Sequence, residues 1–130
     1  MKKAAAFLCL LLLSTLTALA GEKFPDISLA DLKKAIAEKR VTLLDVNGSE
    51  TYKAGHIPGA LDFETAEDGL AAKLPADKGA LIVAYCADEN CGAFAFAAEK
   101  ARELGYTNVK HFPAGLAGWK KAGEKTAPGT

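Results

Sequence analysis

Residues 81–92 read Leu81-Ile82-Val83-Ala84-Tyr85-Cys86-Ala87-Asp88-Glu89-Asn90-Cys91-Gly92, an apolar run followed by a polar loop that holds two cysteines. The apolar run predicts a buried β-strand. After the loop, apolar residues recur at helical spacing at Phe94, Ala97, Ala101 and Leu104. Cys86 is therefore expected where a strand stops before a helix. Ligands collect at that edge of open α/β sheets, and the amides of a helix N-terminus favour a thiolate. The alternative for Cys86 is an inert core cysteine, since free cysteine packs as a small hydrophobe.

The rest of the chain alternates between helical and strand patterns. A surface helix begins at Ser28, with Asp31 in a capping-box position. The further elements expected are a strand over 41–46, a short helix over 49–53, a tight turn over 55–59, a short strand over 60–63, a weak helix over 67–73, a strand over 80–85, a helix over 93–104, a strand over 108–112 and a short helix carrying Trp119. This alternation predicts an α/β fold with a mostly parallel sheet flanked by helices on both faces.

The N-terminal segment has the pattern of a secretory signal peptide, which we expect to cover residues 1–20. Lys2 and Lys3 form a basic start, residues 4–13 are an unbroken apolar run, and Ala18-Leu19-Ala20 offers small residues before Gly21. An uncleaved anchor is the alternative, but the segment 4–20 is at the lower limit of the length that spans a bilayer. We expect cleavage, a periplasmic or secreted product, and no membrane attachment after cleavage.

The charge balance argues against nucleic acid as a partner. The chain of 130 residues has 16 basic and 16 acidic side chains, and removal of residues 1–20 takes away two lysines and no carboxylate. Neither this balance nor any cluster of Lys and Arg supplies the basic footprint that phosphate binding needs. The remaining chain divides into a folded domain over 21–122 and a polar tail over 123–130. A domain of this size folds without a disulfide framework, so two cysteines in an exported protein indicate chemistry or mutual pairing.

Five short motifs occur in a fixed order along the chain. They are Leu43-Leu44-Asp45-Val46, Glu50-Thr51-Tyr52 with Gly55-His56-Ile57-Pro58-Gly59-Ala60, Tyr85-Cys86, Leu104-Gly105-Tyr106-Thr107-Asn108-Val109, and Gly115-Leu116-Ala117-Gly118-Trp119. In this order and at these separations, from about Ile27 to Trp119, the chain resembles a single rhodanese domain. The resemblance implies a parallel five-stranded sheet between helices and a cysteine that carries sulfane sulfur at the end of the central strand.

Carried over by position, Cys86 is the persulfide-forming cysteine of this resemblance. The loop that follows would be the cradle that points backbone N–H groups at the persulfide or at an anionic donor. Its substrate-binding residues would be Ala87, Asp88, Glu89, Asn90 and Gly92. Such a cradle stabilises the charge of the terminal sulfur without a metal or another cofactor, so we expect neither.

The cradle departs from the usual pattern of the family. Active members usually place an arginine or lysine, a glycine and a serine there, where this chain has Asp88, Glu89, Asn90 and Cys91, followed by Ala93 and Phe94. Two carboxylates oppose an anionic donor by like-charge repulsion. Asn47 stands where the family often has an arginine, which removes an ion-pair partner near the loop. These departures weaken the expectation of thiosulfate turnover.

Cys91 distinguishes this loop further. The loop is longer than usual, and Cys86 and Cys91 resemble a subset of exported rhodanese-like domains with a Cys-x4-Cys loop. A disulfide that closes so short a loop contributes only about 2 kcal/mol by chain entropy, which favours a resolving or redox partner over a structural staple. A permanent disulfide and an unpaired bystander remain the alternatives.

The supporting residues implied by the resemblance are Asp45, Asn47 and His56. Asp45 would bond to backbone and hold the neighbouring turn, and His56 would be a structural turn residue, with a role as general base for Cys86 as the minor alternative. His111 is expected at a half-exposed surface position. A zinc site from the cysteines and histidines is disfavoured because His56 and His111 lie far apart in the sequence, unlike the close pairs of zinc sites.

The sequence leads to one main functional hypothesis and two alternatives. The main hypothesis is an exported sulfurtransferase or sulfur carrier, monomeric, that forms a persulfide on Cys86 with Cys91 as its resolving or redox partner. Its expected partners are a sulfane-sulfur donor or a protein thiol. The alternatives are a noncatalytic binding module with a lasting Cys86–Cys91 disulfide, and a thiol–disulfide oxidoreductase.

Overall fold

A computed structural model of the chain describes residues 24–129. The expected signal peptide at 1–20 lies outside the described residues. The elements, in chain order, are α1 (Leu29–Ala37), β1 (Val41–Asp45), α2 (Ser49–Ala54), β2 (Leu61–Asp62), α3 (Phe63–Ala66), the 3-10 turn η1 (Glu67–Gly69), α4 (Leu70–Lys73), β3 (Leu81–Tyr85), α5 (Phe94–Glu103), β4 (Val109–His111) and α6 (Gly115–Lys121). Between residues 24 and 129 there is no helix with the length and hydropathy needed to cross a membrane.

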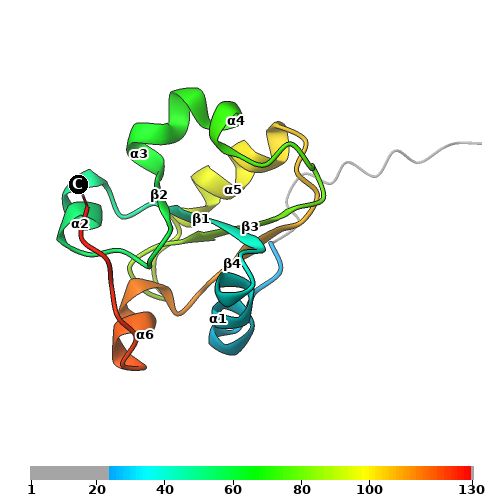
Figure 1. The fold of residues 1–130 in the computed structure, drawn as a ribbon. Helices are drawn as coiled ribbons and strands as arrows, with labels where there is room; N and C mark the ends of the chain where they lie inside the picture. Colours follow the sequence, from blue (N-terminus) through cyan, green and yellow to red (C-terminus); the bar gives the residue numbers. More distant parts are fainter. Residues whose placement is uncertain (1–23, 130) are drawn as a thin grey trace, which may run out of the picture.

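The sheet has four parallel strands in the order β2-β1-β3-β4 (Figure 1). Five strands were expected, and the difference lies in the segment before α1. There Asp26 forms a single bridge to His111, with Ile27 N–H donating to the His111 carbonyl (2.8 Å) and His111 N–H donating to the Pro25 carbonyl (2.9 Å). Pro25 has no N–H to extend the ladder, and Ser28 already caps α1. The fifth strand is therefore reduced to one bridge at the sheet edge.

Helices cover both faces of the sheet, as the alternating pattern predicts. In Figure 1, α3, α4 and α5 lie on one face, and α1 and α6 lie on the other. Neighbouring residues of β3 point to opposite faces, so Ile82 and Ala84 join one apolar cluster while Val83 and Tyr85 join the other. Each cluster is completed by buried helix residues, the first by Ala97, Ala98 and Ala101 and the second by Leu32, Leu116 and Trp119. The sheet is thus buried on both sides, and its carboxyl edge is left for the site.

The segment after β2 differs locally from the sequence expectation. Phe63 was expected to end a strand, but it begins α3, because the Asp62 side chain caps that helix by accepting a hydrogen bond from Glu64 N–H (3.2 Å). The weak helix expected over 67–73 is divided into η1 and α4. Leu70 and Leu74 are nevertheless buried in the cluster under α5.

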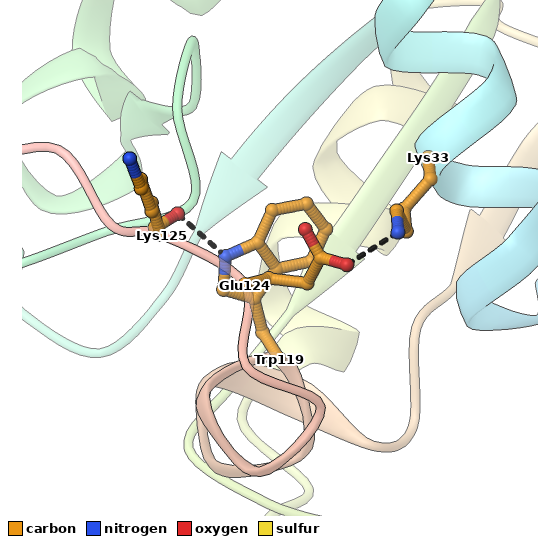
Figure 2. A network of polar contacts seen from close by, with 4 residues as sticks. All are labelled: Lys33, Trp119, Glu124 and Lys125. Carbon is orange, nitrogen blue, oxygen red and sulfur yellow. Dashed lines mark hydrogen bonds and ion pairs between the residues drawn. The ribbon is translucent and has the colours of Figure 1, made fainter.

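The C-terminal segment 124–129 returns along the domain. His56 and Ala127 exchange two backbone hydrogen bonds (3.0 and 2.9 Å), and Gly129 N–H donates to the Lys53 carbonyl (3.0 Å). Figure 2 shows two further ties, the Trp119 indole N–H donating to the Lys125 carbonyl (2.8 Å) and the ion pair between Lys33 and Glu124. The polar segment therefore packs against α1, α2 and α6.

Candidate functional site

Cys86 lies directly after β3, at the carboxyl edge of the sheet, and is 1 % exposed. Its carbonyl accepts a hydrogen bond from Leu116 N–H (2.9 Å), and the Ala87 carbonyl accepts one from Ala117 N–H (2.8 Å). Gly115 permits this contact for two reasons. Its φ of +63° is a backbone conformation that favours glycine, and a Cβ added to it would lie too close to the Cys86 carbonyl oxygen, at 2.7 Å. The first turn of α6 therefore fixes the start of the loop, which explains the place of the glycine-rich motif 115–119 beside the cysteine.

Cys86 and Cys91 are joined by a disulfide, with an S–S distance of 2.04 Å and a Cα–Cα distance of 6.0 Å. The alternative that Cys91 is an unpaired bystander is wrong for this structure. The two sulfurs differ in their surroundings, since Cys86 is buried and Cys91 is partly exposed. An external thiol therefore reaches the disulfide through Cys91.

The loop is exposed at each cradle residue assigned from the sequence, which are Ala87, Asp88, Glu89 and Asn90 between the cysteines and Gly92 after Cys91. It closes on Asp88, whose side chain accepts from Asn90 N–H (2.9 Å) and whose carbonyl accepts from Cys91 N–H (3.2 Å). This is an Asx-type turn. Two amides of the expected cradle are thus bonded to Asp88, and they become available to a sulfur on Cys86 only if this turn opens.

The loop leads into α5, which begins at Phe94. Its N-cap is Ala93, which lies two residues after Cys91 and provides no side-chain hydrogen bond to the helix. The unpaired amides of a helix N-terminus carry a partial positive charge, which favours a nearby thiolate. The strand end, loop and helix start are therefore arranged as the sequence of residues 81–92 predicts.

A buried network ties the ends of β1 and β3 to two turns at this edge of the sheet. One carboxylate oxygen of Asp45 accepts from Asn47 N–H (2.8 Å), and the other accepts from the Tyr85 hydroxyl (2.5 Å). The Tyr85 oxygen in turn accepts from Ile57 N–H (3.0 Å). Burial raises the pKa of Tyr85, and the charge of Asp45 raises this pKa further, so the phenol stays protonated and donates.

This network assigns a positioning role to Tyr85 that the sequence reasoning missed. Tyr85 immediately precedes Cys86, and its hydroxyl connects the end of β1 to the turn over 55–59. Asp45 holds the neighbouring turn, the role that the resemblance implied. The available sequence signal was a tyrosine within an otherwise aliphatic strand, where a buried hydroxyl needs a partner.

Asn47 and His56, expected as supporting residues, lie outside the loop. Asn47 is half-buried, and its side-chain nitrogen has no hydrogen-bond partner among residues 24–129. His56 is buried, its Nδ1 lies 2.9 Å from the Tyr52 carbonyl, and its ring stacks on the Tyr52 ring with 3.7 Å between centroids. These contacts make His56 a structural turn residue.

His111 is buried, and the expectation of a half-exposed position is wrong. Its ring stacks on the Phe94 ring with 3.4 Å between centroids. Burial lowers the pKa of His111, and the neighbouring Asp26 opposes this in part. In the part of the chain that the structure describes, no three His, Cys, Asp or Glu side chains are grouped so that they could hold a metal ion.

Residues 28–122 match the family model of the rhodanese-like domain. The chain belongs to the rhodanese-like domain family. The curated proteins that are similar to it in sequence include a human sulfurtransferase and a mycobacterial regulator. A human thiosulfate:glutathione sulfurtransferase is 32 % identical over 108 residues, which are 73 % of this chain and 92 % of that protein. An HTH-type transcriptional regulator of Mycobacterium tuberculosis is 40 % identical over 105 residues, which are 79 % of this chain. The chain spans 45 % of that regulator's length.

The solved structure of a human single-domain sulfurtransferase is similar to this rhodanese-like domain. It superposes with a TM-score of 0.62 at 26 % identity and covers 76 % of this chain and 97 % of its own. Rhodanese-like proteins named as sulfurtransferases are thus among the relatives of this domain in both sequence and structure. In this rhodanese-like domain the loop after β3 is acidic and is closed by the Cys86–Cys91 disulfide.

Proposed function

We propose that this rhodanese-like domain is an exported sulfurtransferase or sulfur carrier, in which Cys86 forms the persulfide and Cys91 resolves it. The observation that carries the proposal is the disulfide between a buried cysteine at the end of the interior strand β3 and a partly exposed cysteine in the following loop. Membership of a family that includes sulfurtransferases supports the reaction class. Export rests on the signal pattern of residues 1–20.

The proposed cycle starts from the disulfide. A dithiol supplies two electrons and two protons, which open the Cys86–Cys91 bond and give two thiols. The Cys86 thiolate then attacks the outer sulfur of a sulfane donor, the donor's S–S bond breaks, and the donor's remaining group leaves with the electron pair. The product is a persulfide on Cys86.

The persulfide has two exits. An acceptor thiolate attacks its outer sulfur, which gives the acceptor persulfide and returns Cys86 as a thiolate. Alternatively, the Cys91 thiolate attacks the inner sulfur of Cys86, which re-forms the disulfide and releases hydrosulfide. In the second exit the cysteine pair supplies the two electrons that reduce the sulfane sulfur to sulfide.

Sulfur uptake by cysteine variants tests the assignment. Reduced protein exposed to polysulfide and quenched with acid at short times should gain about one sulfur, ~32 Da by intact mass, because one nucleophile accepts one sulfane atom before Cys91 displaces it. Cys86→Ser should abolish the gain and Cys91→Ser should retain it. If Cys91→Ser loses the gain while Cys86→Ser keeps it, the nucleophile is misassigned.

A thiol–disulfide oxidoreductase is the second candidate function. The disulfide with one accessible sulfur favours it, since such a bond exchanges with external thiols without any sulfane donor. Protein that exchanges readily with dithiols but takes up no sulfur after reduction would select this function. A disulfide that resists dithiols in the folded protein would select the binding module.

A further inference from the structure

Phe96 stands out on the surface beside the disulfide loop. It is 75 % exposed, and no other large apolar side chain among residues 24–129 is exposed. It lies in the first turn of α5, five positions after Cys91. Residues three, four and seven positions apart share a helix face, so Phe96 lies on one stripe with Glu99, Lys100 and Glu103.

Two hollows meet at Phe96. The first, of about 330 Å³, has Val46, Phe63 and Ala93 as its apolar lining. The second, of about 370 Å³, follows the outer stripe of α5. Phe96 and Glu67 line both hollows, which makes them one continuous surface. We call this surface, between η1 and α5, the α5 trough. Its first end begins at Ala93, two residues after Cys91.

The polar lining of the α5 trough is mostly acidic. Glu64, Glu67, Glu99 and Glu103 are all exposed, and Lys100 is the basic residue among the lining residues. The exposed Asp88 and Glu89 extend the negative charge into the disulfide loop. An apolar hollow with an acidic rim complements a segment that carries an apolar anchor and basic side chains.

We propose that the α5 trough docks a basic segment with an apolar anchor, belonging to a partner protein whose two thiols reduce the Cys86–Cys91 disulfide. This rests on the proposed function and names the class of its reductant. Docking at the trough brings a thiol toward Cys91, the more accessible sulfur of the pair. The acidic rim also disfavours a second copy of this chain, because two such rims repel each other.

The exchange balances within the two proteins. One partner thiolate attacks the Cys91 sulfur, the bond to Cys86 breaks, and Cys86 leaves as a thiolate. The second partner thiol gives up its proton and attacks the partner's sulfur in the mixed disulfide, which releases Cys91 as a thiolate. The partner ends as a disulfide, and the domain has gained two electrons. When both of its thiolates are protonated, the domain has also gained two protons.

The test uses two synthetic dithiol peptides with the same Cys-x-x-Cys core and the same phenylalanine anchor, one flanked by lysines and the other by glutamates. The rate of disulfide reduction is measured by acid quench and intact mass, with dithiothreitol as an uncharged reference. The lysine peptide should react at least about tenfold faster than the glutamate peptide at low salt, and the difference should shrink as salt is added. Equal rates for the two peptides would overturn the proposal.

Three variants locate the effect on the surface. Phe96→Ala and Glu67→Lys should each lower the ratio of the lysine-peptide rate to the dithiothreitol rate by about three- to tenfold. Glu38→Lys makes the same change of charge next to α1, on the other face of the sheet, and should leave the ratio unchanged. A loss as large in Glu38→Lys as in Glu67→Lys would mean that net charge alone acts, and the trough would be rejected.

Two further measurements separate the remaining outcomes. If sedimentation shows a concentration-dependent dimer that Phe96→Ala abolishes, the trough is an interface between copies and the docking proposal is wrong. Sulfur uptake by chemically reduced protein is measured independently of the peptides. Uptake without any peptide preference leaves the proposed function standing and removes the docking proposal, whereas failure of uptake removes the proposed function.

Discussion

Replacement of Asp88 and Glu89 by Asn and Gln should accelerate the reaction of the reduced protein with thiosulfate. Both side chains are exposed in the loop that starts at Cys86 and ends at Cys91. The Cα atoms of these two cysteines are 6.0 Å apart. A like charge about 4 to 8 Å away in a medium close to water in dielectric constant raises the barrier by roughly 0.5 to 1 kcal/mol. Removal of both charges should therefore speed the reaction by roughly five- to thirtyfold.

The substitution is conservative for the loop. Asp88 accepts from Asn90 N–H through Oδ1, and asparagine keeps an oxygen at that position. The assay mixes prereduced protein with excess thiosulfate and follows the gain of sulfur by intact mass over time. The advantage of the double variant should shrink with added salt, and an uncharged organic trisulfide should show little difference. A slower reaction of the double variant with thiosulfate would refute the electrostatic reasoning and indicate that the carboxylates recognise a cationic or protein-borne donor.

Three other predictions test the fold and the processing. Gly115→Ala should lower the free energy of unfolding by about 2 kcal/mol or more in urea titrations. Gly59→Ala is the control and should cost about 1 kcal/mol, because Gly59 has a φ of +86° but its added Cβ would meet no described atom within 4 Å. Equal losses in the two variants would contradict the contact between residue 115 and Cys86. Because burial lowers the pKa of His111, the unfolded chain binds this proton more readily, so the free energy of unfolding should fall as pH drops below about 6.5. His111→Gln should weaken that pH dependence, and an unchanged slope would contradict it. N-terminal sequencing of protein from its native host should start at Gly21, and retention of Met1 in a membrane fraction would favour the anchor.

The carboxyl edge of the sheet was predictable because its signals are local. The apolar run 81–85 and the helical spacing after Gly92 each report on a few neighbouring residues, and together they place Cys86 between a strand and a helix. The end of the strand expected over 60–63 was predicted less well. The Asp62 side chain caps α3, so Phe63 begins a helix instead of ending the strand.

Other features depend on contacts between distant segments, which leave little pattern in the sequence. The tail over 124–129 packs against the rest of the domain mainly through backbone hydrogen bonds, so its side-chain composition does not reveal the contact. His111 lies on a short edge strand, and its burial follows from stacking on Phe94 at the start of α5. The buried stripe of α5 was predicted from Ala97 and Ala101, and Phe96 lies off this stripe, but the hollow that Phe96 lines also needs Val46 and Phe63 from distant segments.

A single-turnover measurement of released sulfide tests whether Cys91 resolves a persulfide on Cys86. Reduced protein is loaded with sulfur from polysulfide, freed of excess donor, and followed for sulfide and for free thiols. The wild-type domain should release about one equivalent of sulfide and return to the Cys86–Cys91 disulfide, since attack on the inner sulfur expels the outer one. Cys91→Ser should hold its sulfur until an external thiol is added. If Cys91→Ser releases sulfide at the same rate, or if loaded wild-type protein never re-forms the disulfide, then Cys91 does not resolve the persulfide.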